Sequence, residues 1–197
     1  MTHVAEDLRR TVLDASLALV AEEGLTALSM REVARRAGVS HQAPYHHFKD
    51  RAAILAALAE EGYVKLQAGM RKAAAKGKTP LEKLEGTGRA YIQFALANPA
   101  LFKIMHQSEL VQIEDHDQTL SIAQETFDML VGFIEEAARQ ANKSLNPAEV
   151  AITAWCVVHG TAMLLLENRL QRKFPARAKE SAATETVLRT FSRLFEH

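Results

Sequence analysis

Residues 29–48 read SMREVARRAGVSHQAPYHHF, and the ends of two short helices can be recognised in them. The hydroxyl of Ser29 can accept a hydrogen bond from the amide of Glu32, whose side chain can reach back to the amide of Ser29. This reciprocal capping box predicts the start of the first helix. Gly38 can adopt the left-handed conformation that ends it, and Ser40 is placed to cap a second helix.

Two helices separated by three or four residues that include a glycine match the helix-turn-helix, whose second helix enters the major groove of DNA. A helix that discriminates bases must present short side chains at the contact, with donors or acceptors on its exposed face. The residues that meet this requirement are His41, Gln42, Ala43 and Pro44. Gln42 can bond adenine bidentately, and Ala43 and Pro44 can contact a thymine methyl.

Pro44 is unusual at the fourth position of a helix, because it has no amide to donate and its ring crowds the carbonyl of Ser40. One interpretation is that Pro44 only tightens a short helix, with a distorted first turn. The other is that it forms a rigid edge against a thymine methyl.

This segment resembles the N-terminal DNA-binding domain of the TetR family of bacterial transcriptional regulators. The resemblance rests on Gly24, on the run LSMREVARRAGVS, on the cluster Tyr45, His47 and Phe48, and on an acidic N-cap that opens a long helix. It covers roughly residues 5–66 and implies the fold of that domain. Trp155, His159 and Gly160 also resemble a signature in the C-terminal domain of one TetR subgroup.

The resemblance implies roles for individual residues. In the family, residues at the positions of Tyr45 and His47 contact phosphates, and those at Gln42, Ala43 and His46 face base edges. Lys49 and Arg51 resemble the family's basic residue at the start of the next helix, which clamps phosphate. The full set that we expect to contact DNA is Ser29, Arg31, Ser40, His41, Gln42, Ala43, Pro44, Tyr45, His46, His47, Lys49 and Arg51.

Other interpretations remain open for several of these side chains. Tyr45 and Phe48 stand at helical spacing and could belong to the core, which is the preferred interpretation for Phe48. Arg35 and Arg36 could be a solvated face. Neighbouring histidines point about 100° apart on a helix, and the acid four residues after His46 is Asp50, which the next helix needs as its cap. We therefore expect no metal.

The composition is that of an ordinary globular protein, with 48% hydrophobic and 24% charged residues in 197. The single cysteine excludes an internal disulfide, and with no targeting segment a reducing cytosol is expected, which predicts a cytoplasmic protein. The longest weakly polar stretch, residues 150–166, falls short of the roughly 20 apolar residues of a spanning helix. It predicts a core helix that is apolar on all sides, and no membrane partner.

Charge is segregated along a chain whose net charge is zero. Residues 29–51 contain five Lys or Arg residues against two acids, which gives +3 and suits a phosphate-facing end. Between Ile104 and Ala138 there is no Lys or Arg. The acids of that region are Glu109, Glu114, Asp115, Asp117, Glu125, Asp128, Glu135 and Glu136. They suggest, as a hypothesis, a cationic effector; a solvated face is the preferred explanation.

Helical periodicity and capping signals predict an all-α protein of about nine helices. The expected ranges are 4–23, 29–38, 40–48, 50–75, 79–97, 98–107, 118–140, 146–170 and 180–195. No segment has the period of two or the hairpin turns of a sheet. We expect a helix-turn-helix domain at 1–50 and a helical effector-binding and dimerisation domain at 51–197.

The second domain has no recognisable catalytic constellation, and Cys156 with His159 is one turn of an apolar helix, so we expect neither an enzyme nor a cofactor. Relatives in the TetR family use this region for a small-molecule pocket and a dimer. Large apolar side chains and one histidine are candidates for lining such a pocket, with a packed core as the alternative. These candidates are Tyr91, Phe94, Phe102, Met105, Phe127, Met129, Trp155, His159 and Met163.

Dimerisation is expected because one recognition helix covers only half of an operator. The apolar stripe of the last helix and part of the 146–170 helix are the candidate interface. The residues are Leu164, Leu165, Val187, Leu188, Phe191, Leu194 and Phe195.

The sequence therefore predicts a ligand-responsive, dimeric, DNA-binding regulator of the TetR type. A repressor with a palindromic operator is the preferred form. The rival hypothesis is a TetR-like coactivator that binds proteins instead of DNA, and the basic, polar recognition helix argues against it. An architectural DNA binder is a third alternative, but it would need no second domain.

Overall fold

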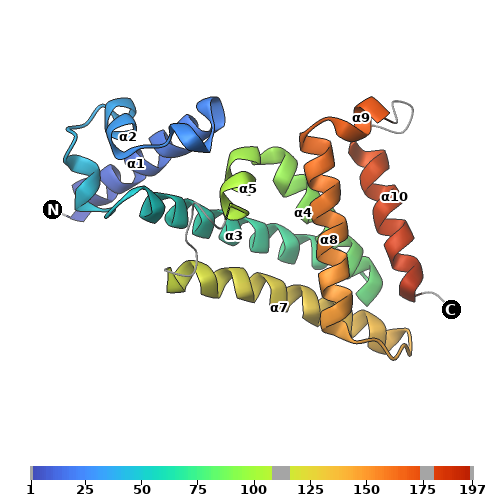
Figure 1. Ribbon diagram of the computed structural model, residues 1–197. Coiled ribbons are helices and arrows are strands. Elements are labelled where there is room, and N and C mark those ends of the chain that lie inside the picture. The colour runs from blue at the N-terminus through green and yellow to red at the C-terminus, as the bar shows by residue number, and fades with distance from the viewer. Residues whose placement is uncertain (1, 108–115, 174–179, 196–197) are drawn as a thin grey trace. The chain divides into compact units, whose positions relative to one another are not determined.

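The computed structural model describes residues 2–107, 116–173 and 180–195, and these are helical with connecting turns (Figure 1). The α-helices are α1 (Thr2–Glu23), α2 (Met30–Ala37), α3 (Arg51–Ala74), α4 (Pro80–Ala97), α5 (Pro99–Met105), α7 (Asp117–Gln140), α8 (Pro147–Leu166), α9 (Arg169–Lys173) and α10 (Glu180–Ser192). Three 3₁₀ turns are η1 (Leu25–Ala27), η2 (Ala43–His46) and η5 (Arg193–Phe195). The predicted all-α class is confirmed.

The predicted start signals fix several of these helices. Thr79 accepts a hydrogen bond from the amide of Glu82 at 3.2 Å, and the Glu82 carboxylate accepts from the amide of Thr79 at 3.4 Å, so the capping box of α4 is complete. Asn146 accepts from the amide of Ala148 at 3.2 Å and begins α8. Because each cap satisfies an amide that has no partner inside its helix, these short polar residues define where the helices begin.

The chain divides into two compact units. The first contains residues 1–63 and 99–122, and the second contains residues 64–98 and 123–197. The helix-turn-helix segment lies in the first unit, while α4, α8 and α10 lie in the second. Helices α3 and α7 each contribute residues to both units.

The first unit is built on the packing of α1 against α2, η2 and α5. Its fully buried side chains include Leu13 of α1, Val33 of α2 and Phe102 of α5. At Gly62 a Cβ atom would lie 2.5 Å from Sδ of Met105, so a larger residue there would require the Met105 side chain to move. The adjacent Tyr63 donates its hydroxyl to the carbonyl of Met105 at 3.3 Å, and burial raises the pKa of the Tyr63 phenol.

The second unit is held by mutual packing of α4, α8 and α10. A methyl group on Gly88 of α4 would lie 2.7 Å from Leu188 of α10 and 3.4 Å from Val158 of α8, so all three helices meet at this glycine. Arg89 of α4 adds a bidentate ion pair to Glu185 of α10, with nitrogen–oxygen distances of 2.6 and 2.8 Å. This pair raises the pKa of Arg89 and lowers that of Glu185.

Helix α8 differs from its prediction as a helix buried on all sides. Only 33% of its most apolar 18-residue window is buried. One face, which includes Ala151, Ala154 and Leu165, packs inside the second unit, and the other carries exposed apolar side chains. Length and composition alone would allow α8 to cross a membrane, a property shared by core helices of soluble proteins. The apolar character of α8 was predicted correctly, but its one-sided burial was not.

Candidate functional site

The first helix of the helix-turn-helix is capped largely as predicted. Ser29 has extended backbone angles and accepts from the amide of Glu32 at 3.2 Å, and Gly38 is left-handed with φ of 68°. The carboxylate of Glu32, however, pairs with Arg35 one turn along, with both oxygens accepting from Nε at 3.0 and 2.9 Å. The Arg35 bond holds the pKa of Glu32 below its ordinary value. The predicted box is thus half formed, because a guanidinium outcompetes the neutral amide of Ser29 for the carboxylate.

The recognition segment is a short 3₁₀ turn rather than a helix capped by Ser40. Its helical residues are Ala43–His46, and the amide of Ala43 donates to the carbonyl of Ser40 at 3.0 Å. The residue that caps η2 is Gln42, with no side-chain bond. Because Pro44 has no amide, it cannot donate the i−4 bond that an α-helix starting at Ser40 would need. The distortion expected in the first turn at Pro44 therefore affects all of η2, which is 3₁₀ throughout.

The side chains predicted to contact bases differ in how far they are exposed to solvent. His41, Gln42 and His46 are exposed, and Ala43 is half-buried. Tyr45 is 44% exposed, and its ring stacks with that of His41 at a centroid distance of 6.0 Å.

Pro44 is a correction to the predicted contact set, because its side chain is buried. A ring that packs inside the first unit cannot form an edge against a thymine methyl. The interpretation in which Pro44 tightens a short element agrees with this placement. Phe48 is also buried, with 4% exposure, which agrees with its preferred core interpretation.

The residues predicted to contact phosphates flank the base-contacting residues in the sequence. Ser29, Arg31, Ser40 and Lys49 are exposed, while His47 and Arg51 are half-buried. Asp50 accepts from the amide of Ala53 at 3.0 Å and so orders the start of α3, where Arg51 is the first residue. We name the exposed and half-buried members of this set, residues 29, 31, 40–43, 45–47, 49 and 51, the reading surface.

Arg36 has a structural partner. It pairs with Glu22 and with Glu23 at the end of α1, the latter at 3.5 Å. These ion pairs link α2 to α1 across the turn that contains Gly24. Arg36 therefore holds the helix-turn-helix to its supporting helix.

A second group of predicted residues meets inside the second unit. Nε1 of Trp155 donates to the hydroxyl of Tyr91 at 3.3 Å, and that hydroxyl lies 2.9 Å from Nδ1 of His159. Phe127 of α7 packs edge-on against Trp155, with ring centroids 6.1 Å apart. Tyr91 is buried, while 42% of Trp155 is exposed. We name these four residues the aromatic cluster.

One hydrogen-bond direction in the aromatic cluster is fixed by its donor. An indole nitrogen can only donate, so the Tyr91 oxygen accepts from Trp155, while the direction of the bond between that hydroxyl and Nδ1 of His159 depends on the imidazole tautomer. Burial lowers the pKa of His159 below its ordinary value and so disfavours the imidazolium. The cluster therefore favours an uncharged His159.

The remaining predicted pocket residues are distributed over both units. Phe94, Met129 and Met163 belong to the second unit, where Phe94 is buried and the two methionines are half-buried. Phe102 and Met105 belong instead to the core of the first unit, with 0% and 4% exposure. Apolarity alone could not separate core residues from pocket residues.

The predicted dimer residues divide in a similar way. Leu164 and Leu194 are exposed by 38% and 50%, and Val187 and Phe191 are half-buried. Leu165, Leu188 and Phe195 are corrections, since they are at most 5% exposed and pack within their own chain. The exposed apolar face of α8 extends beyond the predicted residues to Ile152 and Cys156, and it includes Gly160, where an added Cβ would meet no atom. We name Ile152, Cys156, Gly160 and Leu164 the α8 stripe.

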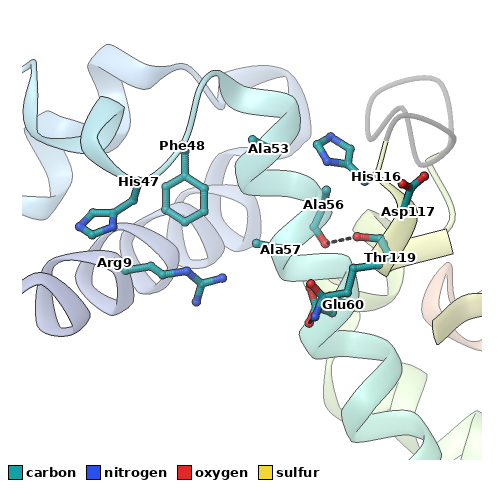
Figure 2. A pocket seen from close by; sticks show the side chains of 11 residues that line it. Arg9, His47, Phe48, Ala53, Ala56, Ala57, Glu60, His116, Asp117 and Thr119 are labelled. Atoms are coloured by element: carbon teal, nitrogen blue, oxygen red, sulfur yellow. Dashed lines mark hydrogen bonds between the residues drawn. The ribbon is translucent and has the colours of Figure 1, made fainter. Parts of the chain in front are cut away.

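A groove of about 390 Å³ in the first unit was not predicted (Figure 2). Its lining comes from α1, from the end of the helix-turn-helix, from the first turns of α3 and from the start of α7. Arg9, Glu60 and His116 lie on it, together with His47 of the reading surface. These residues are distant in sequence and share no motif, so no sequence signal could have grouped them.

Part of the predicted acidic region lies outside the described residues, namely Glu109, Glu114 and Asp115. Of its other members, Asp117, Glu125, Asp128 and Glu135 are exposed. Glu136 pairs with Lys83 of α4 at 2.8 Å. The described acids thus behave as a solvated face with one ion pair.

Comparisons with known proteins cover most of the chain. Residues 12–58 match the family model of bacterial regulatory proteins of the tetR family, and residues 84–190 match a model of the tetracyclin repressor-like C-terminal domain. A protein of unknown function from Rhodococcus sp. RHA1 is similar, with 29% identity, 94% of each chain covered and a TM-score of 0.79.

Two further solved structures share the fold. The TetR family transcriptional regulator PfmR from Thermus thermophilus is 19% identical, with 94% of each chain covered and a TM-score of 0.70. The transcriptional regulator FadR from Bacillus subtilis, crystallised in complex with stearoyl-CoA, is also 19% identical. The alignment covers 93% of this chain and 97% of FadR, with a TM-score of 0.74.

Proposed function

The chain belongs to the TetR family of DNA-binding transcriptional regulators, and from that premise we propose that it is a homodimeric repressor which a small-molecule effector releases from its operator. The observation that carries the proposal is the combination of an exposed reading surface in the first unit with a polar group inside the apolar second unit. In functional terms, residues 1–50 would read DNA, and residues 51–197 would bind the effector and dimerise.

The reading surface supports base recognition by a small number of side chains. Gln42 and His46 present donors and acceptors to solvent, and the half-buried Ala43 beside them is small enough to let the backbone approach a groove. Arg31 and Lys49 are exposed cations that can neutralise phosphates. Phosphate contacts would set the register of η2, and the contacts of Gln42 would give sequence preference.

The α8 stripe supports a two-fold dimer. Ile152, Cys156, Gly160 and Leu164 recur every four residues and form one ridge of the helix. A glycine in that ridge allows a second helix to approach closely, and an apolar exposed face of this kind marks an interaction site. A homodimer would carry two reading surfaces about 34 to 36 Å apart, or a multiple of that spacing, on a palindromic operator.

The aromatic cluster supports effector binding in the second unit. Tyr91 and His159 place hydrogen-bonding atoms among aromatic rings, which is the usual composition of small-molecule sites. The ligand would compete for a hydrogen bond in the Trp155, Tyr91 and His159 chain. Such a protein works in the cytoplasm, and the proposal assigns it no catalytic step and no cofactor.

An effector screen tests the release step. A dimer bound to its operator would be challenged with cationic, neutral and anionic compounds, including long-chain acyl-CoA of the type present in the FadR crystal. Tyr91→Phe should retain operator affinity and lose most of the response to the active compound, because the hydroxyl at the centre of the cluster is gone. A variant that responds as the wild type does would exclude the cluster as the effector site.

The coactivator alternative has a separate outcome. A protein-interaction module would bind no duplex DNA even at low salt, where phosphate contacts are strongest. Binding that weakens steeply as salt rises, with a residual sequence preference, supports the regulator.

A further inference from the structure

The groove in the first unit is distinct from the aromatic cluster and shares only His47 with the reading surface. Its floor is the small-residue face of α3, formed by Ala53, Ala56 and Ala57. A volume of about 390 Å³ falls within the range of roughly 300 to 1,000 Å³ that small-molecule sites occupy. The floor is apolar, so the charged groups of the groove stand only on its walls.

One wall carries positive charge. In Figure 2, Arg9 and Phe48 lie on one side of the first turns of α3. The guanidinium of Arg9 stands 5.6 Å from the centroid of the Phe48 ring, and this cation–π contact holds it beside the groove. Among the described residues Arg9 forms no ion pair with a carboxylate, so its donors remain available.

The opposite wall carries negative charge. Glu60 and Asp117 line the groove there, on α3 and at the start of α7. Glu60 accepts a hydrogen bond from the side chain of Gln118 at 2.7 Å, and within the described part of the chain neither acid has a cationic partner. The hydroxyl of Thr119 donates to the carbonyl of Ala56 at 3.4 Å, which ties this wall to α3.

Opposite charges thus line one groove without touching each other, and an apolar floor separates them. We propose that the groove binds a small zwitterion whose carboxylate meets Arg9, whose ammonium group meets Glu60 and Asp117, and whose hydrocarbon body lies on the alanines. Each charge would gain a charge-assisted hydrogen bond that a neutral or singly charged molecule cannot supply at both ends. A molecule bound there touches His47 and Phe48, and so reaches the helix-turn-helix directly.

The test measures binding to the full-length protein without DNA, so its result is independent of the repressor proposal. The probes are ω-amino acids of four, six and eight carbons, each compared with the carboxylic acid and the amine of the same length. Calorimetry and thermal unfolding would be followed up to about 10 mM, where a site of millimolar affinity is largely filled. One ω-amino acid should bind at least roughly tenfold more tightly than either singly charged analogue, since each analogue loses one charged hydrogen bond.

Two variants and one control locate the binding. Arg9→Gln removes the positive wall, and Ala57→Leu fills the floor; both should weaken binding by at least roughly tenfold. Arg172→Gln, which changes an exposed arginine of α9 in the second unit, should leave it unchanged.

Three results would overturn the proposal: equal binding of singly charged and zwitterionic probes, wild-type affinity in Arg9→Gln, or no binding by any of the three chain lengths. Circular dichroism would check that Ala57→Leu folds. If that variant does not fold, Arg9→Gln, at an exposed position, decides the outcome.

Discussion

The hydroxyl of Tyr91 on α4 lies 2.9 Å from Nδ1 of His159 on α8, and these two residues are 68 positions apart in the sequence. This contact gives the second unit a polar link within an apolar interior. Burial lowers the pKa of His159 and so favours the neutral imidazole in the folded state. Protonation of His159 is therefore coupled to folding.

Stability should fall in mildly acidic solution because of His159. Burial lowers the pKa of this residue in the folded state, so as pH drops below the ordinary value of about 6.5 the unfolded chain takes up a proton before the native one does. The free energy of unfolding then decreases as pH falls through this window, and above it the effect is absent. Urea unfolding at several pH values from about 7.5 to about 5.5 should show a steeper loss for the wild type than for His159→Asn. An equal loss of stability with falling pH in the two proteins would show that His159 is not the cause.

Pro44→Ala and Gln42→Ala should have different effects on DNA. Pro44 is buried, so its replacement should change stability and leave base preference unaltered. Gln42 is exposed, and its loss should cost about 1 to 3 kcal/mol at the base pair it reads. Binding to a library of operator variants would measure both. A changed preference in Pro44→Ala would restore the interpretation of this residue as an edge against a methyl group.

Replacing Gly69 of α3 and Gly77, just after α3, by alanine should change the stability of the protein in opposite directions. A Cβ on Gly77 would lie 2.6 Å from the backbone nitrogen of Lys83, so Gly77→Ala must shift backbone and should destabilise by about 1 to 3 kcal/mol. Gly69 lies inside α3 with open space around it, and Gly69→Ala should stabilise by up to about 1 kcal/mol through helix propensity. Urea denaturation of both variants measures this. Equal effects in the two would show that crowding at Gly77 is unimportant.

Leu164→Glu should break the proposed dimer. Leu164 is exposed on the α8 stripe, and each substitution would act twice across a two-fold interface. Losing two buried leucines costs about 3 kcal/mol or more, which weakens dimerisation by roughly 100-fold or more. Leu120→Glu, at a similarly exposed leucine of α7 in the first unit, is the matched control. In sedimentation, Leu164→Glu should be monomeric and Leu120→Glu should remain a dimer. If both variants were dimers, the α8 stripe would not be the interface.

Local signals in the sequence predicted the helices well. Thr79 and Asn146 mark helix starts because a cap acts on amides only two or three residues away. Gly38 ends α2 for an equally local reason, its positive φ. Pro44 was recognised as a disturbance, but its burial was not predicted, because the side on which a ring packs depends on elements distant in sequence.

The candidate sites were less predictable because distant residues form them. Helical spacing brought Trp155 and His159 to one face, and only the fold brought Tyr91 to them. Periodicity likewise predicted an apolar stripe near the C-terminus without showing that Leu188 faces α4 while Leu194 faces solvent. The groove beside Arg9 left no sequence signal.

Selection of bound duplexes from a random DNA pool, at two salt concentrations, tests the central claim most directly. The wild type should enrich a palindromic site, and a Gln42→Ala, Tyr45→Ala double variant, which loses two exposed side chains of the reading surface, should fail to enrich it. Absence of any enriched site at the lower salt concentration, or the same site recovered by the variant, would contradict recognition of an operator through this surface.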